Sequence, residues 1–188
     1  MKGVYIIMYI NKSLELQYIT NQDDPTIANK KFGVATISHS GCGIIASYNA
    51  LISMGHALPF DKVLAYYNSR IATTLGFGLT GLLSCNIKQY FTSLGFRVVI
   101  ANKKEQIDRL SKTADGCIMY YKFPRMYRPL GISFNAYGAH FIEYSKTDGG
   151  YIGRNTSENN GSYKFVNPSD YGNKSNRYGM VGIFIFKK

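Results

Sequence analysis

One cysteine in this chain stands in a sequence context that could activate its thiol. Cys42 lies between Gly41 and Gly43, and an apolar stretch typical of a buried helix follows it through Met54. A helix that begins here places the thiol beside unpaired backbone N–H groups and the positive end of the helix dipole, which both favour a thiolate. The flanking glycines allow a substrate backbone to approach closely. We therefore expect Cys42 to be a nucleophile.

The histidine best placed to act as the base for this thiol is His140. It lies in an expected strand over residues 138–145, where Gly138 should leave space in front of the imidazole. Since His39 is only three residues from Cys42, in the loop that enters the helix, it is poorly placed for a productive contact with the thiol. His140 is therefore the expected base.

An Asp-Gly turn at residues 148–149 predicts the register between this strand and the next one. In that register Glu143 faces Arg154, an opposite-charge pair across the two strands. Asn155 is then the diagonal neighbour of His140, within reach of its side chain. An oxygen of Asn155 could accept a hydrogen bond from one imidazole nitrogen and leave the other directed toward the thiol.

The order of these residues resembles that of papain-like cysteine peptidases, in which a cysteine at a helix start precedes a histidine on a strand and an asparagine on the next strand. Gly41-Cys42-Gly43, with Ala46 and Leu51 further along, is most similar to the compact bacterial peptidases that process bacteriocins after a double glycine. The resemblance covers about residues 30–188. It implies an α+β papain-like fold, with the nucleophile on a buried helix packed against an antiparallel sheet. It also implies a Cys42, His140 and Asn155 triad that cleaves peptide or other amide bonds without a cofactor or a metal.

Papain-like enzymes usually carry a glutamine six residues before the cysteine, where its amide stabilises the oxyanion of the reaction. Thr36 occupies that position in this chain. The sequence therefore identifies one oxyanion donor, the backbone N–H of Cys42, and leaves the second donor unassigned.

Two other kinds of function stay open at this point. An amidase or a transglutaminase-like acyl transferase would use the same residues on the same fold, with a different groove and acceptor. A catalytically silent papain-like domain would instead serve as a basic binding module, with Cys42 a small core residue. Asp148 could orient His140 in place of Asn155, but an Asp-Gly pair between strands is first of all a turn.

The helices and strands expected to position these residues indicate a single domain of 188 residues in three parts. These parts are an N-terminal hairpin and loop (1–30), a helical portion (31–95) and a mainly β portion (96–188), with the loop continuing to Ser40. Helices are expected at 42–54, at 61–73 capped by Asp61, at 80–94 capped by Thr80, and at 104–111. Strands are expected at 97–101, 117–123, 138–145, 150–156 and 178–186. Helices first and antiparallel strands later indicate an α+β fold.

Charge and cysteine content limit the partners and the compartment. Lys and Arg number 22 against 11 Asp and Glu, a net charge of +11, but they are scattered and give no strong nucleic-acid signal. No apolar stretch is long enough for a membrane span, and the N-terminus predicts a strand rather than a secretion signal. The unpaired Cys42, Cys85 and Cys117 favour a reducing compartment such as the cytoplasm. A peptide or protein substrate is the expected partner, and the oligomeric state is left open.

A crystal structure of the free protein is expected to place the Cys42 sulfur about 3 to 5 Å from a ring nitrogen of His140, because proton transfer requires that proximity. A separation beyond about 8 Å, with no mobile loop between the two residues, would contradict a Cys42–His140 site.

Overall fold

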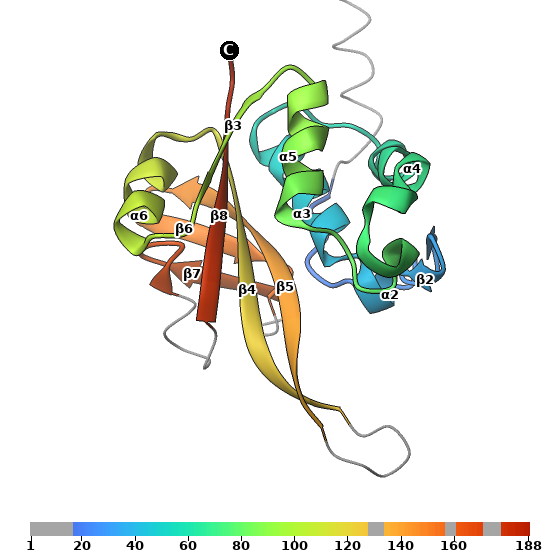
Figure 1. Ribbon diagram of the computed structural model, residues 1–188. Helices are drawn as coiled ribbons and strands as arrows, with labels where there is room; N and C mark the ends of the chain where they lie inside the picture. The colour runs from blue at the N-terminus through green and yellow to red at the C-terminus, as the bar shows by residue number, and fades with distance from the viewer. Residues whose placement is uncertain (1–16, 128–133, 157–160, 171–177) are drawn as a thin grey trace, which may run out of the picture.

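The computed structural model describes residues 17–127, 134–156, 161–170 and 178–188. Their largest element is a six-stranded antiparallel sheet (Figure 1). Its strands are β3 (Arg97–Ala101), β4 (Gly116–Tyr127), β5 (Phe134–Thr147), β6 (Gly150–Arg154), β7 (Ser162–Phe165) and β8 (Tyr178–Phe186), paired in the order β3-β8-β4-β5-β6-β7. Helices and an antiparallel sheet in one chain confirm the expected α+β class.

Helices cover both faces of this sheet. On one face lie α3 (Cys42–Ser53) and α5 (Ser84–Ser93), with α4 (Phe60–Ser69) packed against α3, while α6 (Lys104–Thr113) covers the other face (Figure 1). Short elements complete the helical side: β1 (Lys31–Phe32), β2 (Ala35–Thr36), α2 (Ile37–Ser40), and the 3-10 helices η1 (Ile71–Thr73) and η2 (Leu75–Gly78). In the ranges that the structure describes, no helix has the length and apolar character needed to cross a bilayer.

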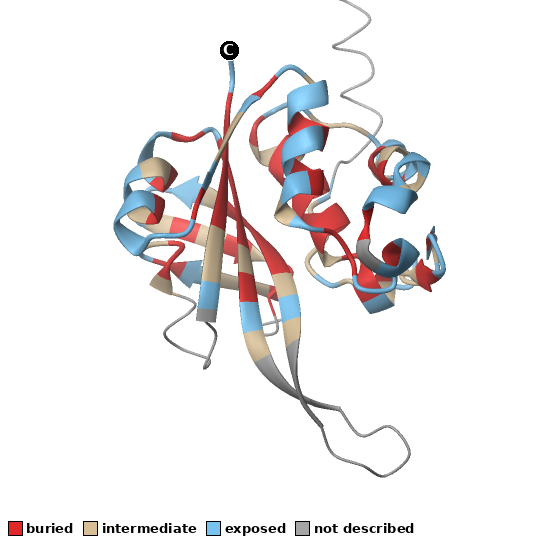
Figure 2. Cartoon of the chain, in the orientation of Figure 1, coloured by how far each residue is buried: buried red, intermediate tan, exposed pale blue. Residues whose placement is uncertain are grey.

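Helix α3 forms the centre of the larger hydrophobic core, as its sequence predicts. Ile44, Ile45 and Leu51 are fully buried, and burial extends around most of the helix (Figure 2). The helix stops at Gly55, whose φ of +70° suits glycine after a helix end. A second core of buried residues lies under α6, so the sheet is apolar on both faces.

Several expected elements differ from the observed ones. The predicted N-terminal hairpin falls mostly within residues 1–16, outside the described residues. The predicted loop up to Ser40 is wrong in part, since it contains β1, β2 and α2. Neither predicted cap holds: α4 begins at Phe60, before Asp61, and at α5 the Asn86 side chain accepts from Leu83 N–H at 2.9 Å. These short-range hydrogen bonds leave weak signals in the sequence.

Asn49 ties α3 to the chain segment that precedes the helical layer. Its side chain is fully buried; Oδ1 accepts from Ile19 N–H at 2.9 Å, and Nδ2 donates to the Ile19 carbonyl at 2.7 Å. A polar side chain in the middle of an apolar helix must find such partners, because an unpaired buried amide is costly. The two bonds fix residues 19–22 against the helix.

Replacing Asn49 with Ala is expected to lower the free energy of unfolding by about 1 to 3 kcal/mol, because both backbone groups of Ile19 lose their partners. Urea denaturation followed by circular dichroism measures the change.

Asn68 offers a matched control, since its side chain makes the same two bonds in a more exposed place, to Gly33 N–H and the Lys31 carbonyl. Asn68→Ala should cost less, because water can replace the lost bonds there. Equal decreases in the free energy of unfolding of the two variants would contradict the larger cost expected for losing the two buried hydrogen bonds of Asn49.

Candidate active site

Cys42 is the first residue of α3 and is half-buried. The backbone N–H of Phe141, on β5, acts to lower the pKa of its thiol. Helix and strand approach closely here, since a Cβ on Gly43 would lie 3.3 Å from the Phe141 ring and 3.1 Å from Leu82. Glycine after the cysteine therefore allows β5 to lie beside the thiol.

The electrostatic setting of this thiol has two opposing parts. Burial raises the pKa of Cys42 above its ordinary value, while the backbone N–H groups of Phe141, Gly43 and Cys42 itself act in the lowering direction. Burial has the larger effect, although the residue keeps some accessible surface. This direction is opposite to the one expected from the helix start alone. A thiolate at Cys42 therefore needs a proton acceptor or a positive charge nearby.

The hairpin register predicted from the Asp-Gly turn is confirmed. Strands β5 and β6 pair Glu143 with Arg154 and Thr147 with Gly150. Arg154 donates to the Glu143 carboxylate at 2.9 Å, and the Glu143 side chain is completely buried. This register brings Asn155, directly after β6, beside His140.

His140 is held by the main chain of Asn155. Its Nε2 lies 2.5 Å from the Asn155 carbonyl oxygen. Because a carbonyl oxygen can only accept, Nε2 must carry the hydrogen and donate. A neutral ring then has its lone pair on Nδ1, the atom that a general base would use. His140 thus has the tautomer that a base opposite a thiol needs.

The group that contacts the ring differs from the one expected. The side chain of Asn155 was expected to orient the imidazole, whereas the contact is made by its backbone oxygen. Asn155 has a φ of +64°, in the left-handed region, which turns this carbonyl toward His140. Within the described residues, its buried Nδ2 has no hydrogen-bond partner. The expected space at Gly138 is also filled, by the ring of Phe123 on β4.

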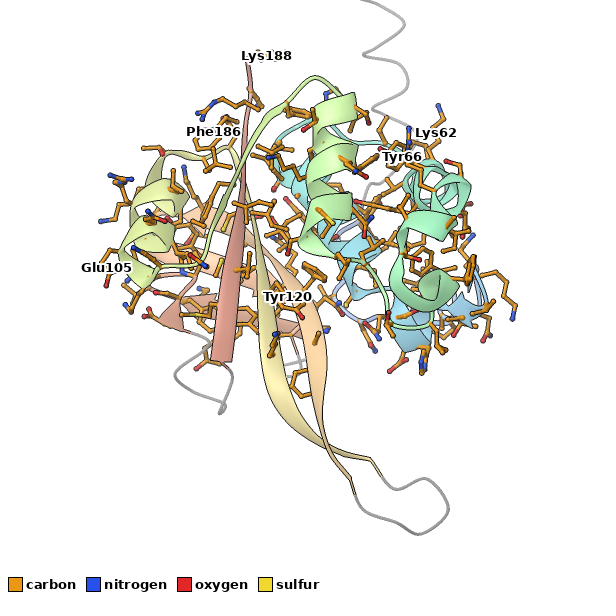
Figure 3. All side chains as sticks on the ribbon, viewed as in Figure 1. Lys62, Tyr66, Glu105, Tyr120, Phe186 and Lys188 are labelled. Carbon is orange, nitrogen blue, oxygen red and sulfur yellow. The ribbon has the colours of Figure 1, made fainter. Side chains whose placement is uncertain are left out.

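Tyr120 completes the surroundings of the thiol on the sheet side. It pairs with Phe141 across β4 and β5, and the two rings contact each other with centroids 5.0 Å apart and planes tilted by 50°. Burial raises the pKa of Tyr120, and a negative charge on Cys42 raises it further. Figure 3 labels Tyr120 where the sheet meets the helical layer.

The remaining histidines and cysteines lie elsewhere. His39 is exposed on α2 and His56 contacts the Phe96 ring. Cys85 is exposed on α5, whereas Cys117 is buried in β4, where burial raises its pKa. Across the described ranges, no group of three or more His, Cys, Asp or Glu side chains could hold a metal ion.

The structure adds a glutamine that the sequence did not reveal. Gln22 Nε2 donates to the carbonyl of Ser38, four residues before Cys42, at 2.5 Å. The neighbouring Thr20 carbonyl lies against Gly161, which accepts from Thr156 N–H next to Asn155. Residues 19–22 therefore run between α2 and the loop after β6. Gln22 does not stand six residues before Cys42 in the sequence. The fold instead brings it to Ser38 from another segment.

No protein family model matches the sequence, and no curated protein matches it significantly. The chemistry of the site therefore has to be argued from its own residues.

Replacing Asn155 with Gly is expected to preserve the tautomer of His140, because glycine accepts a φ of +64° and keeps the carbonyl that binds Nε2. Asn155→Ala should reduce the population of this tautomer, since alanine in the left-handed region is strained by about 1 kcal/mol. Nitrogen-15 NMR of the imidazole measures the tautomer. Equal loss in both variants would show that the side chain, and not the carbonyl, orients the ring.

Proposed function

We propose that the chain is a papain-like cysteine hydrolase that cleaves peptide or other amide bonds. Cys42 is the nucleophile, His140 the base and Asn155 the residue that orients His140. One observation carries the proposal: His140 donates from Nε2 to the Asn155 carbonyl, and the ring of the next residue, Phe141, lies against Gly43 in the first turn of the helix that begins at Cys42. Helices followed by an antiparallel sheet, with α3 buried between them, support the papain-like fold.

The first step transfers the thiol proton of Cys42 to Nδ1 of His140. The sulfur then attacks the amide carbonyl carbon and forms a tetrahedral intermediate with a negative oxygen. Burial disfavours a lone thiolate at this position, so the imidazolium formed by the transfer provides the charge that stabilises it. The Asn155 carbonyl keeps the ring aligned through both states, because it accepts from Nε2 in each.

The negative oxygen needs hydrogen-bond donors. The backbone N–H of Cys42 is one, as at the start of other nucleophile helices. Gln22 is our candidate for the second, because its amide carries two hydrogens and the Ser38 carbonyl occupies one of them. Its Oε1 is buried and has no partner among the described residues.

The remaining steps return the enzyme to its starting state. The Nδ1–H of His140 protonates the leaving amine as the C–N bond breaks, which leaves a thioester on Cys42. Water then loses a proton to Nδ1 and attacks the thioester, and the proton returns to the sulfur as the carboxylic acid leaves. An amidase would follow the same steps, and an acyl transferase would replace the water with an amine.

A silent papain-like binding module is the second candidate. The raised pKa of Cys42 favours it, because a buried thiol without an acceptor stays protonated and unreactive at neutral pH. The two candidates therefore differ in one property, whether His140 takes the thiol proton.

Alkylation of Cys42 by iodoacetamide is expected to continue down to about pH 5, because the imidazolium stabilises the thiolate. In His140→Ala the same thiol should label only at alkaline pH, because burial raises its pKa. The expected loss at pH 6 is at least about 10-fold. Mass spectrometry of each cysteine across a pH series gives the rates.

His39→Ala is the matched control, since this exposed histidine lies close in sequence but on α2. It should leave the profile of Cys42 unchanged. If wild type and His140→Ala share one profile, Cys42 is not poised by His140, and the binding-module function becomes the better one.

A further inference from the structure

An open cleft of about 650 Å³ crosses the boundary between the helical layer and the sheet. Its walls come from the start of α5, the start of α6, and strands β4 and β8. Six of its side chains matter for binding: Leu83, Ser84, Asn102, Lys104, Tyr120 and Lys122. Gln22 and Asn155 belong to other elements, so the cleft is a separate part of the surface.

Two of its walls lead to the proposed nucleophile. Tyr120 lines the cleft, and its ring contacts that of Phe141, which lies against Gly43 next to Cys42. On the opposite wall, Leu83 follows Leu82, whose side chain lies against Gly43 in the first turn of α3. A peptide chain passing the thiol in this direction therefore enters the cleft.

The cleft is positively charged. Lys104 and Lys122 line it, and none of its described lining residues is acidic. Lys104 forms an ion pair with Asp108 at 3.2 Å on α6, which neutralises part of its charge. Lys122 is exposed on β4 and has no ion pair among the described residues. Lys122 therefore provides most of the free positive charge.

Its neutral residues indicate the kind of anion that fits. Ser84, Asn102 and Tyr120 can donate hydrogen bonds, while Leu83, Met180 and Val181 add apolar surface. A carboxylate on a short aliphatic stem uses both features. A phosphate polymer would need a longer basic track or stacking platforms, and Tyr120 is the only aromatic residue among the described lining.

The geometry points to this cleft as a specificity subsite that holds an aspartate or glutamate side chain of a peptide substrate, near the bond that Cys42 attacks. The inference rests on the proposed function, because it assigns the substrate class of that same site. Lys122 is the specificity-determining residue, with Ser84, Asn102 and Tyr120 as hydrogen-bond donors.

Binding to the Cys42→Ala chain tests the subsite without any chemistry. The probes are fluorescein-labelled alanine-glycine octapeptides with one Glu, and matched peptides with Gln or Lys at the same position. Fluorescence anisotropy should show Glu peptides binding about 5-fold more tightly than Gln peptides, as for one partly exposed charge pair. Lys122→Gln should abolish that preference, and raised salt should weaken it.

Lys88→Gln is the control variant, because Lys88 is an exposed lysine of α5 that does not line this cleft. It should leave the preference unchanged. Equal or absent binding of the Glu and Gln peptides would overturn the subsite, as would an equal effect of Lys88→Gln. Displacement of the Glu peptide by a single-stranded oligonucleotide at lower concentration would favour a phosphate ligand and also overturn it.

The result separates the two proposals. A Glu preference together with an ordinary labelling profile of Cys42 would keep the acidic-peptide cleft and remove the hydrolase. An activated Cys42 with no Glu preference would keep the hydrolase and remove the acidic-peptide cleft.

Discussion

The ion pair between Glu143 and Arg154 is the interaction on which the candidate site depends. Glu143 is fully buried and Arg154 nearly so, and their side chains meet across β5 and β6 at 2.9 Å. Burial raises the pKa of Glu143, and the charge of Arg154 opposes that change. A hydrogen bond from Ser145 satisfies the carboxylate further. A slip of one residue would put the two charges on opposite faces of the sheet, each buried or exposed without its partner. The pair therefore fixes the register that places Asn155 beside His140.

The surroundings of the thiol combine two requirements that conflict. Close packing of α3 against β5 brings the backbone N–H of Phe141 to the sulfur, but the same packing removes water and raises the pKa of Cys42. Chemistry at such a thiol depends on His140, whose ring is held by a carbonyl oxygen and not by an ionised group. A neutral acceptor fixes the tautomer without adding a negative charge near the sulfur, which would oppose a thiolate. The positive charges of Lys104 and Lys122 in the neighbouring cleft favour a thiolate at longer range.

A feature of the fold or of the candidate site could be predicted where it leaves a periodic or local pattern in the sequence. Helix α3, strand β8 and the β5–β6 register follow from apolar spacing, an Asp-Gly turn and one pair of opposite charges, and they match the structure. Strand β7, the approach of Gln22 to Ser38 and the carbonyl contact of Asn155 depend on how distant segments meet, or on one backbone dihedral angle. Neither a contact between distant segments nor a single dihedral angle leaves a regular pattern of residue types in the sequence. Asn155 itself tolerates a left-handed φ better than most residues, and that was the one available sign of its unusual backbone.

The contact between residues 19–22 and the loop after β6 has a consequence for how the molecule is made. Thr20 meets Gly161, and Cys42 meets Phe141, so the site joins stretches that leave the ribosome far apart in time. During synthesis, α3 exists with its thiol before the strand that carries His140 has been translated. Contacts of such large sequence separation form late in folding, because the long loops between them must close first. A nascent chain would therefore carry an unpaired cysteine and no base. Any activity at this thiol would begin only after the strand that carries His140 has joined the sheet.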